Sequence, residues 1–182
     1  MDLRIVKTRL QIKEAFLNLR GKLMPEKIKV KDICEEAKIN KTTFYKHYTD
    51  SLELSNEIDE EVIEKLMSSF PKREKLFESS REYVRALLLS LENSSELIKK
   101  VFRGKNDVLC SKLEERLHAL FKDKAKNEDD SIKISFAVGG FVRIVNDYLF
   151  GDTVQDVEKI IDYTVKVLEP IIRPKSAAAV GA

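Results

Sequence analysis

Apolar residues recur at helical spacing along almost the whole chain, and this feature limits the possible folds more than any other. Strict apolar–polar alternation, which is typical of strands, never extends beyond a few residues. Glycine and proline, which interrupt helices, number only six and four among 182 residues. Charged residues make up 35% of the chain and apolar residues 43%. The sequence therefore predicts an all-α protein with a filled interior and argues against a sandwich, a barrel or a disordered chain.

Short connectors rich in Gly, Asn, Asp and Ser divide the periodic segments. We expect about nine helices, at about residues 4–23, 30–37, 41–47, 50–70, 75–91, 94–103, 107–124, 130–150 and 153–172. The connector between the fifth and sixth of these is Glu92-Asn-Ser-Ser. The small-residue, aperiodic tail 174–182 is expected to be disordered.

Several function classes lack their sequence signals. Cys34 and Cys110 form no CxxC pair and have no accompanying His cluster, so no disulfide framework or zinc site is expected. The N-terminus lacks the apolar core of a signal peptide, so none is expected, and charged residues interrupt the most apolar stretch, 132–150. No nucleophile–base set or phosphate-binding Gly loop occurs. We expect a soluble cytoplasmic protein that has no cofactor, contacts no membrane and is not an enzyme.

Charge is divided unevenly along the chain. Residues 1–50 carry 12 Lys and Arg against seven Asp and Glu, whereas the remainder has a net charge of −3. A basic first module favours a nucleic-acid or anionic-surface partner. A solvated Lys-rich helix remains the common alternative for any one basic face.

Two short predicted helices lie within this basic module, joined by a very short connection. The connection consists of Lys38 and Ile39 alone. The next residue, Asn40, is placed to cap the second helix by accepting a hydrogen bond from a first-turn amide. Such a connection fits a helix-turn-helix. On the second helix, Phe44 and Tyr48 share one face and are expected to pack inward, which leaves four side chains outward. These are Lys41, Thr42, Tyr45 and Lys46.

Outward residues at the start of such a helix can reach base edges. Lys41 can donate to guanine, and Thr42 can exchange hydrogen bonds with a base or touch a thymine methyl group, so both are candidate readers. Thr43, Tyr45 and His47 offer donors suited to phosphate oxygens. Each of these side chains also has an ordinary explanation as a solvated or locally packed group. The functional interpretation depends on their occurrence together on one short helix after a tight turn.

Ile28–Leu54 closely resembles the DNA-binding domain of the TetR/AcrR family of transcriptional regulators. Three motifs carry the resemblance, which extends over about residues 4–54: Val30-x-Asp32-Ile33, Ala37-x-Ile39 and Thr43-Phe44-Tyr45-x-His47-Tyr48. Lys38 stands where Gly is usual, Lys29 where a capping Thr is common, and Ser51 where a Lys often contacts phosphate. The resemblance adds Lys31 as a base or phosphate contact. It also implies that effector binding moves the fourth helix and changes the spacing of two reading helices.

The last two predicted helices carry broad apolar stripes, with adjacent Gly139 and Gly140 on the first of them. So much apolar surface in a short chain suggests a homodimer interface, although both helices could instead form the core of a monomer. A cavity wall could include Phe102, Cys110, Leu113, Phe121 and Phe136, and one sequence does not separate such a wall from a packed core.

These patterns predict a helix-turn-helix domain at 1–50, an effector-binding and dimerisation domain at 51–173, and the tail 174–182. The leading hypothesis is a homodimeric repressor that binds a near-palindromic operator in double-stranded DNA and is released by a small apolar or amphipathic effector. The alternative is a co-activator or architectural protein of the same type that works through a protein partner and has no effector.

Overall fold

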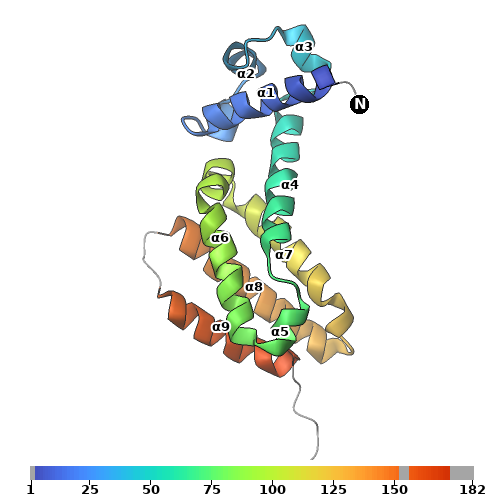
Figure 1. The fold of residues 1–182 in the computed structure, drawn as a ribbon, viewed down its shortest axis with the longest axis vertical. Helices are drawn as coiled ribbons and strands as arrows, with labels where there is room; N and C mark the ends of the chain where they lie inside the picture. Colours follow the sequence, from blue (N-terminus) through green and yellow to red (C-terminus); the bar gives the residue numbers. More distant parts are fainter. Residues whose placement is uncertain (1–2, 152–155, 173–182) are drawn as a thin grey trace, which may run out of the picture. The chain divides into compact units, whose positions relative to one another are not determined.

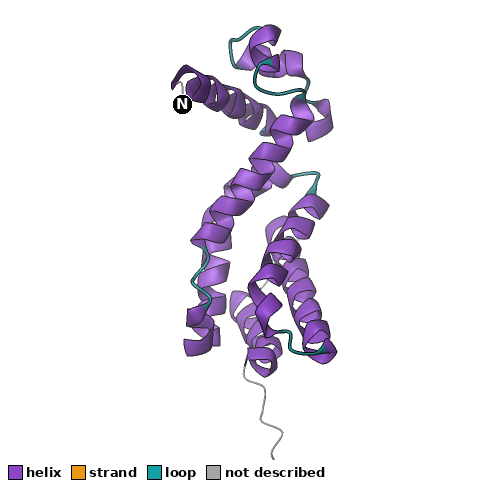
Figure 2. Ribbon diagram, turned by 90° about the vertical axis from the view of Figure 1, so that its right-hand side faces the viewer, coloured by secondary structure: helices purple, strands orange, loops and turns teal. Residues whose placement is uncertain are grey.

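The computed structural model describes residues 3–151 and 156–172, and within them only helices, turns and connecting loops occur (Figures 1 and 2). The α-helices of this part are α1 (Leu3–Arg20), α2 (Val30–Glu36), α3 (Lys41–Tyr45), α4 (Ser51–Ser69), α5 (Glu74–Glu78), α6 (Ser80–Phe102), α7 (Asn106–Phe121), α8 (Glu128–Phe150) and α9 (Val157–Ile172). The prediction of an all-α protein with about nine helices is confirmed. The predicted tail 174–182 lies outside the described residues.

The described chain divides into two compact units. The first contains the chain up to Lys65 together with Glu96–Leu109, and the second contains Leu66–Ser95 and the chain from Cys110 on. Helices α4, α6 and α7 each contribute residues to both units. The predicted module 1–50 lies wholly within the first unit.

In the first unit, α1 packs against α2, and α2 packs against α3 (Figure 1). The fully buried side chains of this unit include Ile12, Phe16, Ile33, Phe44 and Tyr48. The first four come from α1, α2 and α3, and Tyr48 follows α3, so one apolar core fixes the angles between the three helices.

Helix α1 is shorter than the predicted 4–23. It ends at Arg20, after which the amides of Lys22 and Leu23 both bond to the Leu19 carbonyl in a turn. Ile5 and Leu23, the apolar residues near the two ends of the predicted helix, are 47% and 39% exposed. Gly21 weakens helix propagation, so the helix ends in a turn before Leu23.

The predicted break at Glu92-Asn-Ser-Ser is wrong, because α6 runs through it without interruption. The break lies instead at Ser79, between α5 and α6, where the backbone is extended. The Ser79 hydroxyl accepts a hydrogen bond from the Glu82 amide at 3.3 Å and so caps the start of α6.

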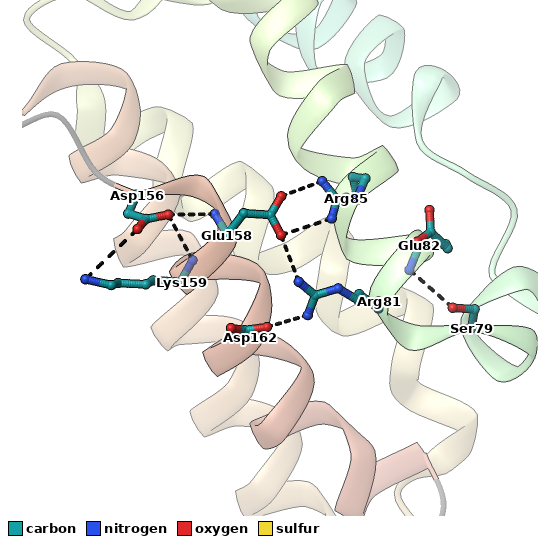
Figure 3. Close-up of polar contacts among 8 residues, drawn as sticks. All are labelled: Ser79, Arg81, Glu82, Arg85, Asp156, Glu158, Lys159 and Asp162. Atoms are coloured by element: carbon teal, nitrogen blue, oxygen red, sulfur yellow. Dashed lines mark hydrogen bonds and ion pairs between the residues drawn. The ribbon is translucent and has the colours of Figure 1, made fainter.

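In the second unit, α8 and α9 lie side by side (Figures 1 and 2). Helix α8 starts two residues before the predicted 130, because Asn127 caps it by accepting a hydrogen bond from the Asp130 amide at 2.9 Å. The described part of α9 begins at Val157, and the predicted start at residue 153 lies outside the described residues. Close to its beginning, α9 is tied to α6 by ion pairs from Arg81 and Arg85 (Figure 3).

Candidate nucleic-acid interface

The turn between α2 and α3 is built from two backbone hydrogen bonds and one unusual residue. The Lys38 amide bonds to the Glu35 carbonyl at 3.2 Å, and the Ile39 amide bonds to the Cys34 carbonyl at 3.0 Å. Together these bonds form a Schellman motif, which ends a helix with one residue in the left-handed conformation. Lys38 is that residue, with φ at 53°. Glycine adopts this conformation freely, whereas a lysine adopts it at a steric cost.

The start of α3 is capped as the sequence predicted. The Asn40 side-chain oxygen accepts a hydrogen bond from the Thr43 amide at 2.7 Å. Helix α3 itself ends at Tyr45, two residues earlier than predicted. The following turn keeps its hydrogen bonds, because the amides of His47 and Tyr48 both bond to the Phe44 carbonyl. The side chains from 41 to 48 therefore still follow helical spacing.

The inward and outward faces of α3 are those that the sequence predicted. Phe44 and Tyr48 are buried, with ring centroids 5.8 Å apart. The four side chains predicted to face outward are exposed: Lys41, Thr42, Tyr45 and Lys46. Thr43 and His47, the remaining candidates on this segment, are partly exposed.

The outward polar groups are available for a partner. Among the residues that the structure describes, the side chains of Lys41, Thr42 and Lys46 have no hydrogen-bond or ion-pair partner. Lys31, on α2, is exposed but lies 3.6 Å from the Glu35 carboxylate, one helical turn away. Both side chains of this pair are exposed, so it is a weak surface contact.

Basic side chains from α1 anchor the inner side of the module to α4. The Arg9 guanidinium lies 4.7 Å from the centre of the Tyr48 ring and forms an ion pair with Glu57. Lys13 pairs with both Glu57 and Glu61. Both basic residues of this group are therefore engaged within the protein.

The pKa values of two ionisable groups in this contact, Tyr48 and Glu57, are shifted from their ordinary values. Burial, reinforced by the nearby negative charge of Glu57, raises the pKa of Tyr48 to about 12. Burial opposes ionisation of Glu57 as well, but hydrogen bonds from Lys13 and Arg9 outweigh it and lower the pKa of that carboxyl. Near neutral pH, the pair is therefore a neutral phenol beside a carboxylate held by two cations.

A buried arginine that helical spacing alone did not predict as a contact joins α1 to the end of α6. Arg20 is only 2% exposed. Its guanidinium donates to the carbonyls of Leu23 at 3.0 Å, Val101 at 2.8 Å and Arg103 at 2.6 Å. The last carbonyls of a helix lack hydrogen-bond donors within the helix, and the Arg20 guanidinium donates to those at the end of α6. Its burial could have been predicted from the sequence, because Arg20 lies four residues after Phe16 and therefore on the buried face of α1.

A second buried polar contact joins α4 to the segment that follows α6. Lys105 forms an ion pair with Asp59, which is 1% exposed, and donates to the Ser55 hydroxyl at 2.9 Å. An acidic residue on the apolar stripe of α4, directly after Ile58, was the sequence signal for this site. The contact ties α4 to the beginning of α7 within the first unit.

The other side chains singled out from the sequence have more ordinary surroundings. Cys34 is buried, as a small core residue would be, and burial raises the pKa of its thiol. Of the five proposed cavity-wall residues, Phe121 and Phe136 line a cavity in the second unit, whereas the other three do not. Across residues 3–151 and 156–172, no cluster of His, Cys, Asp and Glu could hold a metal ion. No helix within those ranges is long and apolar enough to cross a membrane.

Comparison with known proteins gives no assignment. No family model matches the chain, and no curated protein matches it. The geometry and chemistry of the exposed α3 face therefore have to support a function by themselves.

Proposed function

We propose that the protein is a sequence-specific DNA-binding regulator of transcription that acts as a homodimer. The observation that carries the proposal is the capped, exposed α3, which follows a tight turn and presents Lys41, Thr42 and Lys46 without partners among the described residues. An α-helix fits the major groove of B-DNA, where base edges differ for all four base pairs. The resemblance of Ile28–Leu54 to TetR/AcrR DNA-binding domains supports the same function.

Within this function the residues of α3 and of the turn after it divide between two tasks. Lys41 and Thr42, in the first turn, read bases, as such side chains do in helix-turn-helix proteins. Thr43, Tyr45, Lys46 and His47 contact phosphates and hold the helix in register.

The contacts of Arg20 and Lys105 support regulation of the reading helix. They join α1 and α4 to the end of α6 and the start of α7 through buried hydrogen bonds, whose loss is costly. A displacement of the end of α6 would therefore be transmitted to α1 and α4 and so to α3. Such a device favours a regulator released by an effector over a protein that binds DNA constitutively. Repression is the outcome that the family resemblance implies.

The exposed apolar side chains of α8 and α9 support the homodimer. On α8, Ile132 and Phe136 are 60% and 78% exposed, and on α9, Tyr163 and Val167 are 63% and 42% exposed. Each pair is four residues apart and shares one helical face. Contiguous exposed apolar residues of this kind mark protein interfaces.

DNA binding is tested by fluorescence anisotropy with a duplex enriched from a random pool by the wild-type protein and with a scrambled duplex. We expect Lys41→Ala and Thr42→Ala to reduce the preference for the enriched duplex by about 1–3 kcal/mol each. Tyr45→Phe and His47→Ala should weaken binding to both duplexes. Lys46→Ala should also reduce the slope of log affinity against log salt by about 0.9, as expected for one lost phosphate contact.

Lys72→Ala is the matched control, because it removes an exposed lysine from the second unit and should leave both duplexes bound as before. If Lys41→Ala and Thr42→Ala retained the wild-type preference, the assignment of the base readers would be wrong. If the wild-type protein showed no salt-sensitive binding to DNA, the proposed function would be refuted.

A further inference from the structure

The turn after α1 (residues 21–24) and the end of α6 with its following loop (residues 99–104) meet within the first unit, and we call this region the α1–α6 junction (Figure 1). The buried guanidinium of Arg20 donates to the Leu23 carbonyl in the turn and to two carbonyls at the end of α6. The Met24 methyl group fills the space that a side chain at Gly104 would need. These contacts hold the two segments in one fixed arrangement.

Four basic side chains belong to the α1–α6 junction. Lys22 lies in the turn, Lys99 and Lys100 lie in the last turn of α6, and Arg103 directly follows that helix. The Lys100 side chain reaches the turn, since its Cε atom would lie 3.7 Å from a Cβ atom added at Gly21. The other three side chains are exposed, and none of the four has a hydrogen-bond or ion-pair partner among the described residues. Their charges are therefore available to an anionic partner.

Nearby acidic residues do not neutralise this charge. Segments 20–27 and 96–105 contain seven Lys and Arg residues, whereas Glu26 and Glu96 are their two acidic residues. The buried carboxylate of Asp59 is already engaged by Lys105. The surface of the junction therefore has an excess of positive charge, which attracts anionic partners.

Apolar side chains are exposed in the same place. Leu23 and Met24 directly follow Lys22 and are 39% and 38% exposed. Methionine adapts its shape to a partner and is common on peptide-binding surfaces. Phe102, the one aromatic residue of segments 20–27 and 96–105, is fully buried, so no ring there can stack on a nucleic-acid base. Free cations beside exposed aliphatic side chains favour an acidic polypeptide over a nucleic acid.

We propose that an acidic segment of another protein, which also carries apolar side chains, docks on the α1–α6 junction at Lys22, Leu23, Met24, Lys99, Lys100 and Arg103. Carboxylates of the segment pair with the four cations, and the planar guanidinium of Arg103 can hold one of them through two hydrogen bonds. The apolar side chains of the segment pack on the two aliphatic residues. Because the junction is already fixed by Arg20, binding orders little of the protein itself. This docking goes beyond the DNA-binding function and does not depend on it.

The test measures binding of the fluorescein-labelled peptide DELDLFED to the full-length protein by fluorescence anisotropy. We expect saturable binding of one peptide per chain that weakens as salt is added. Two control peptides separate the contributions of charge and apolar contact. NQLNLFQN lacks the carboxylates and DESDSSED lacks the apolar side chains, and each should bind about tenfold more weakly or worse.

Matched protein variants locate the binding site. Lys99→Gln/Arg103→Gln removes two exposed charges of the junction and should weaken DELDLFED about tenfold or more. Lys122→Gln/Lys126→Gln removes two exposed charges of the same spacing from the second unit and should keep the wild-type affinity. Leu23→Ser should weaken DELDLFED and leave the weak binding of DESDSSED unchanged. Since all these side chains are exposed, each variant should keep the helical circular dichroism of the wild type.

Equal affinity of wild type and Lys99→Gln/Arg103→Gln for DELDLFED would overturn the proposal. Binding of DESDSSED as tight as that of DELDLFED would also overturn it, because the site would then accept any anion. If Lys99→Gln/Arg103→Gln weakened binding to the scrambled DNA duplex as much as Lys46→Ala and left the peptide bound, nucleic acid would be the occupant instead. If the peptide binds as expected but the wild type does not bind DNA, the docking site is supported and the proposed function alone fails.

Discussion

Lys38 occupies the one left-handed, non-glycine position found within residues 3–151 and 156–172. For a residue with a Cβ atom, this conformation costs about 1–2 kcal/mol. The turn between α2 and α3 depends on it, since the Ile39 amide reaches the Cys34 carbonyl only after the chain reverses there. The local strain is tolerated because the buried side chains on either side, Ile33 and Phe44, hold the two helices in place.

Lys38→Gly should therefore raise the free energy of unfolding by about 1 kcal/mol, because glycine adopts the left-handed conformation without steric cost. Urea unfolding followed by circular dichroism measures the change. Lys38→Ala is the control, since it removes the charge and the long side chain but keeps the Cβ atom, and its stability should stay close to that of the wild type. If Lys38→Gly were no more stable than Lys38→Ala, the left-handed conformation at this position would carry no steric cost.

Tyr48 predicts a loss of stability at alkaline pH. Its pKa is about 12 in the folded protein, whereas an unfolded tyrosine titrates near 10, so the unfolded chain loses its proton first as the pH rises. Stability from this group is fully present below about pH 10 and is lost as the pH approaches about 12, by about 2–3 kcal/mol in all.

Urea unfolding at about pH 9 and about pH 11.5 should show a larger loss for the wild type than for Tyr48→Phe, which cannot ionise at this position. Tyr45→Phe removes the exposed hydroxyl of a neighbouring tyrosine and should lose as much stability as the wild type. An identical pH dependence in wild type and Tyr48→Phe would show that the phenol is not responsible.

For single side chains, the sequence predicted which ones of α3 face inward, because a helical period assigns faces without knowledge of the rest of the fold. It did not predict the partners of Arg20 and Asp59. Each is a charged residue on an apolar face, and its partners lie 81 and 46 residues away along the chain. Periodicity shows that such a residue is buried, but tertiary packing decides what satisfies it.

Among the elements, α6 shows how packing overrides local preference. Asn93, Ser94 and Ser95 are weak helix formers and each costs a few tenths of a kcal/mol in a helix. The fully buried side chains on either side, such as Leu91, Ile98 and Phe102, each contribute about 1.5–3 kcal/mol by leaving water. Polar residues alone therefore do not end the helix. Local propensity predicts a boundary here because it takes no account of the depth of burial.

A surface ion cluster connects α6 with α9 (Figure 3). Arg85 donates to both carboxylate oxygens of Glu158 at 2.6 and 3.0 Å, and Arg81 bonds to Glu158 at 2.8 Å and to Asp162. Hydrogen bonds from Arg85 and Arg81 lower the pKa values of Glu158 and Asp162 respectively. The contribution of both carboxylates is therefore present above the ordinary carboxyl pKa and is lost as the pH falls through their folded values.

Glu158→Gln should lower the thermal unfolding midpoint at low salt, and the difference from the wild type should vanish in about 1 M NaCl, where the Debye length is about 3 Å. Differential scanning calorimetry at the two salt concentrations measures this. The control is Glu169→Gln, which neutralises another exposed glutamate of α9 that has no ion-pair partner among the described residues. A difference from the wild type that survived high salt would mean that Glu158 acts through packing or hydrogen bonding rather than charge.

On the scale of the whole molecule, the proposed regulator needs two reading helices at a fixed separation. Half-sites one turn of B-DNA apart require the α3 helices of a dimer to lie about 34–36 Å from each other. In the proposed dimer, the exposed apolar side chains of α8 and α9 would form the two-fold interface. An obligate interface of this type buries roughly 2,000 Å² or more.

We expect the wild type to sediment as a dimer at micromolar concentration and Ile132→Glu to sediment as a monomer, because the substitution would bury an unpaired charge in the interface. Since Ile132 is already 60% exposed in the single chain, the variant should keep the helical circular dichroism of the wild type. Its affinity for the enriched duplex should fall to that of a single half-site. Leu89→Glu is the matched control, because Leu89 is 55% exposed on α6 and its replacement should leave the dimer intact. A monomeric wild type, or a dimeric Ile132→Glu variant that binds the full site with wild-type affinity, would exclude this face as the interface through which the two α3 helices are spaced.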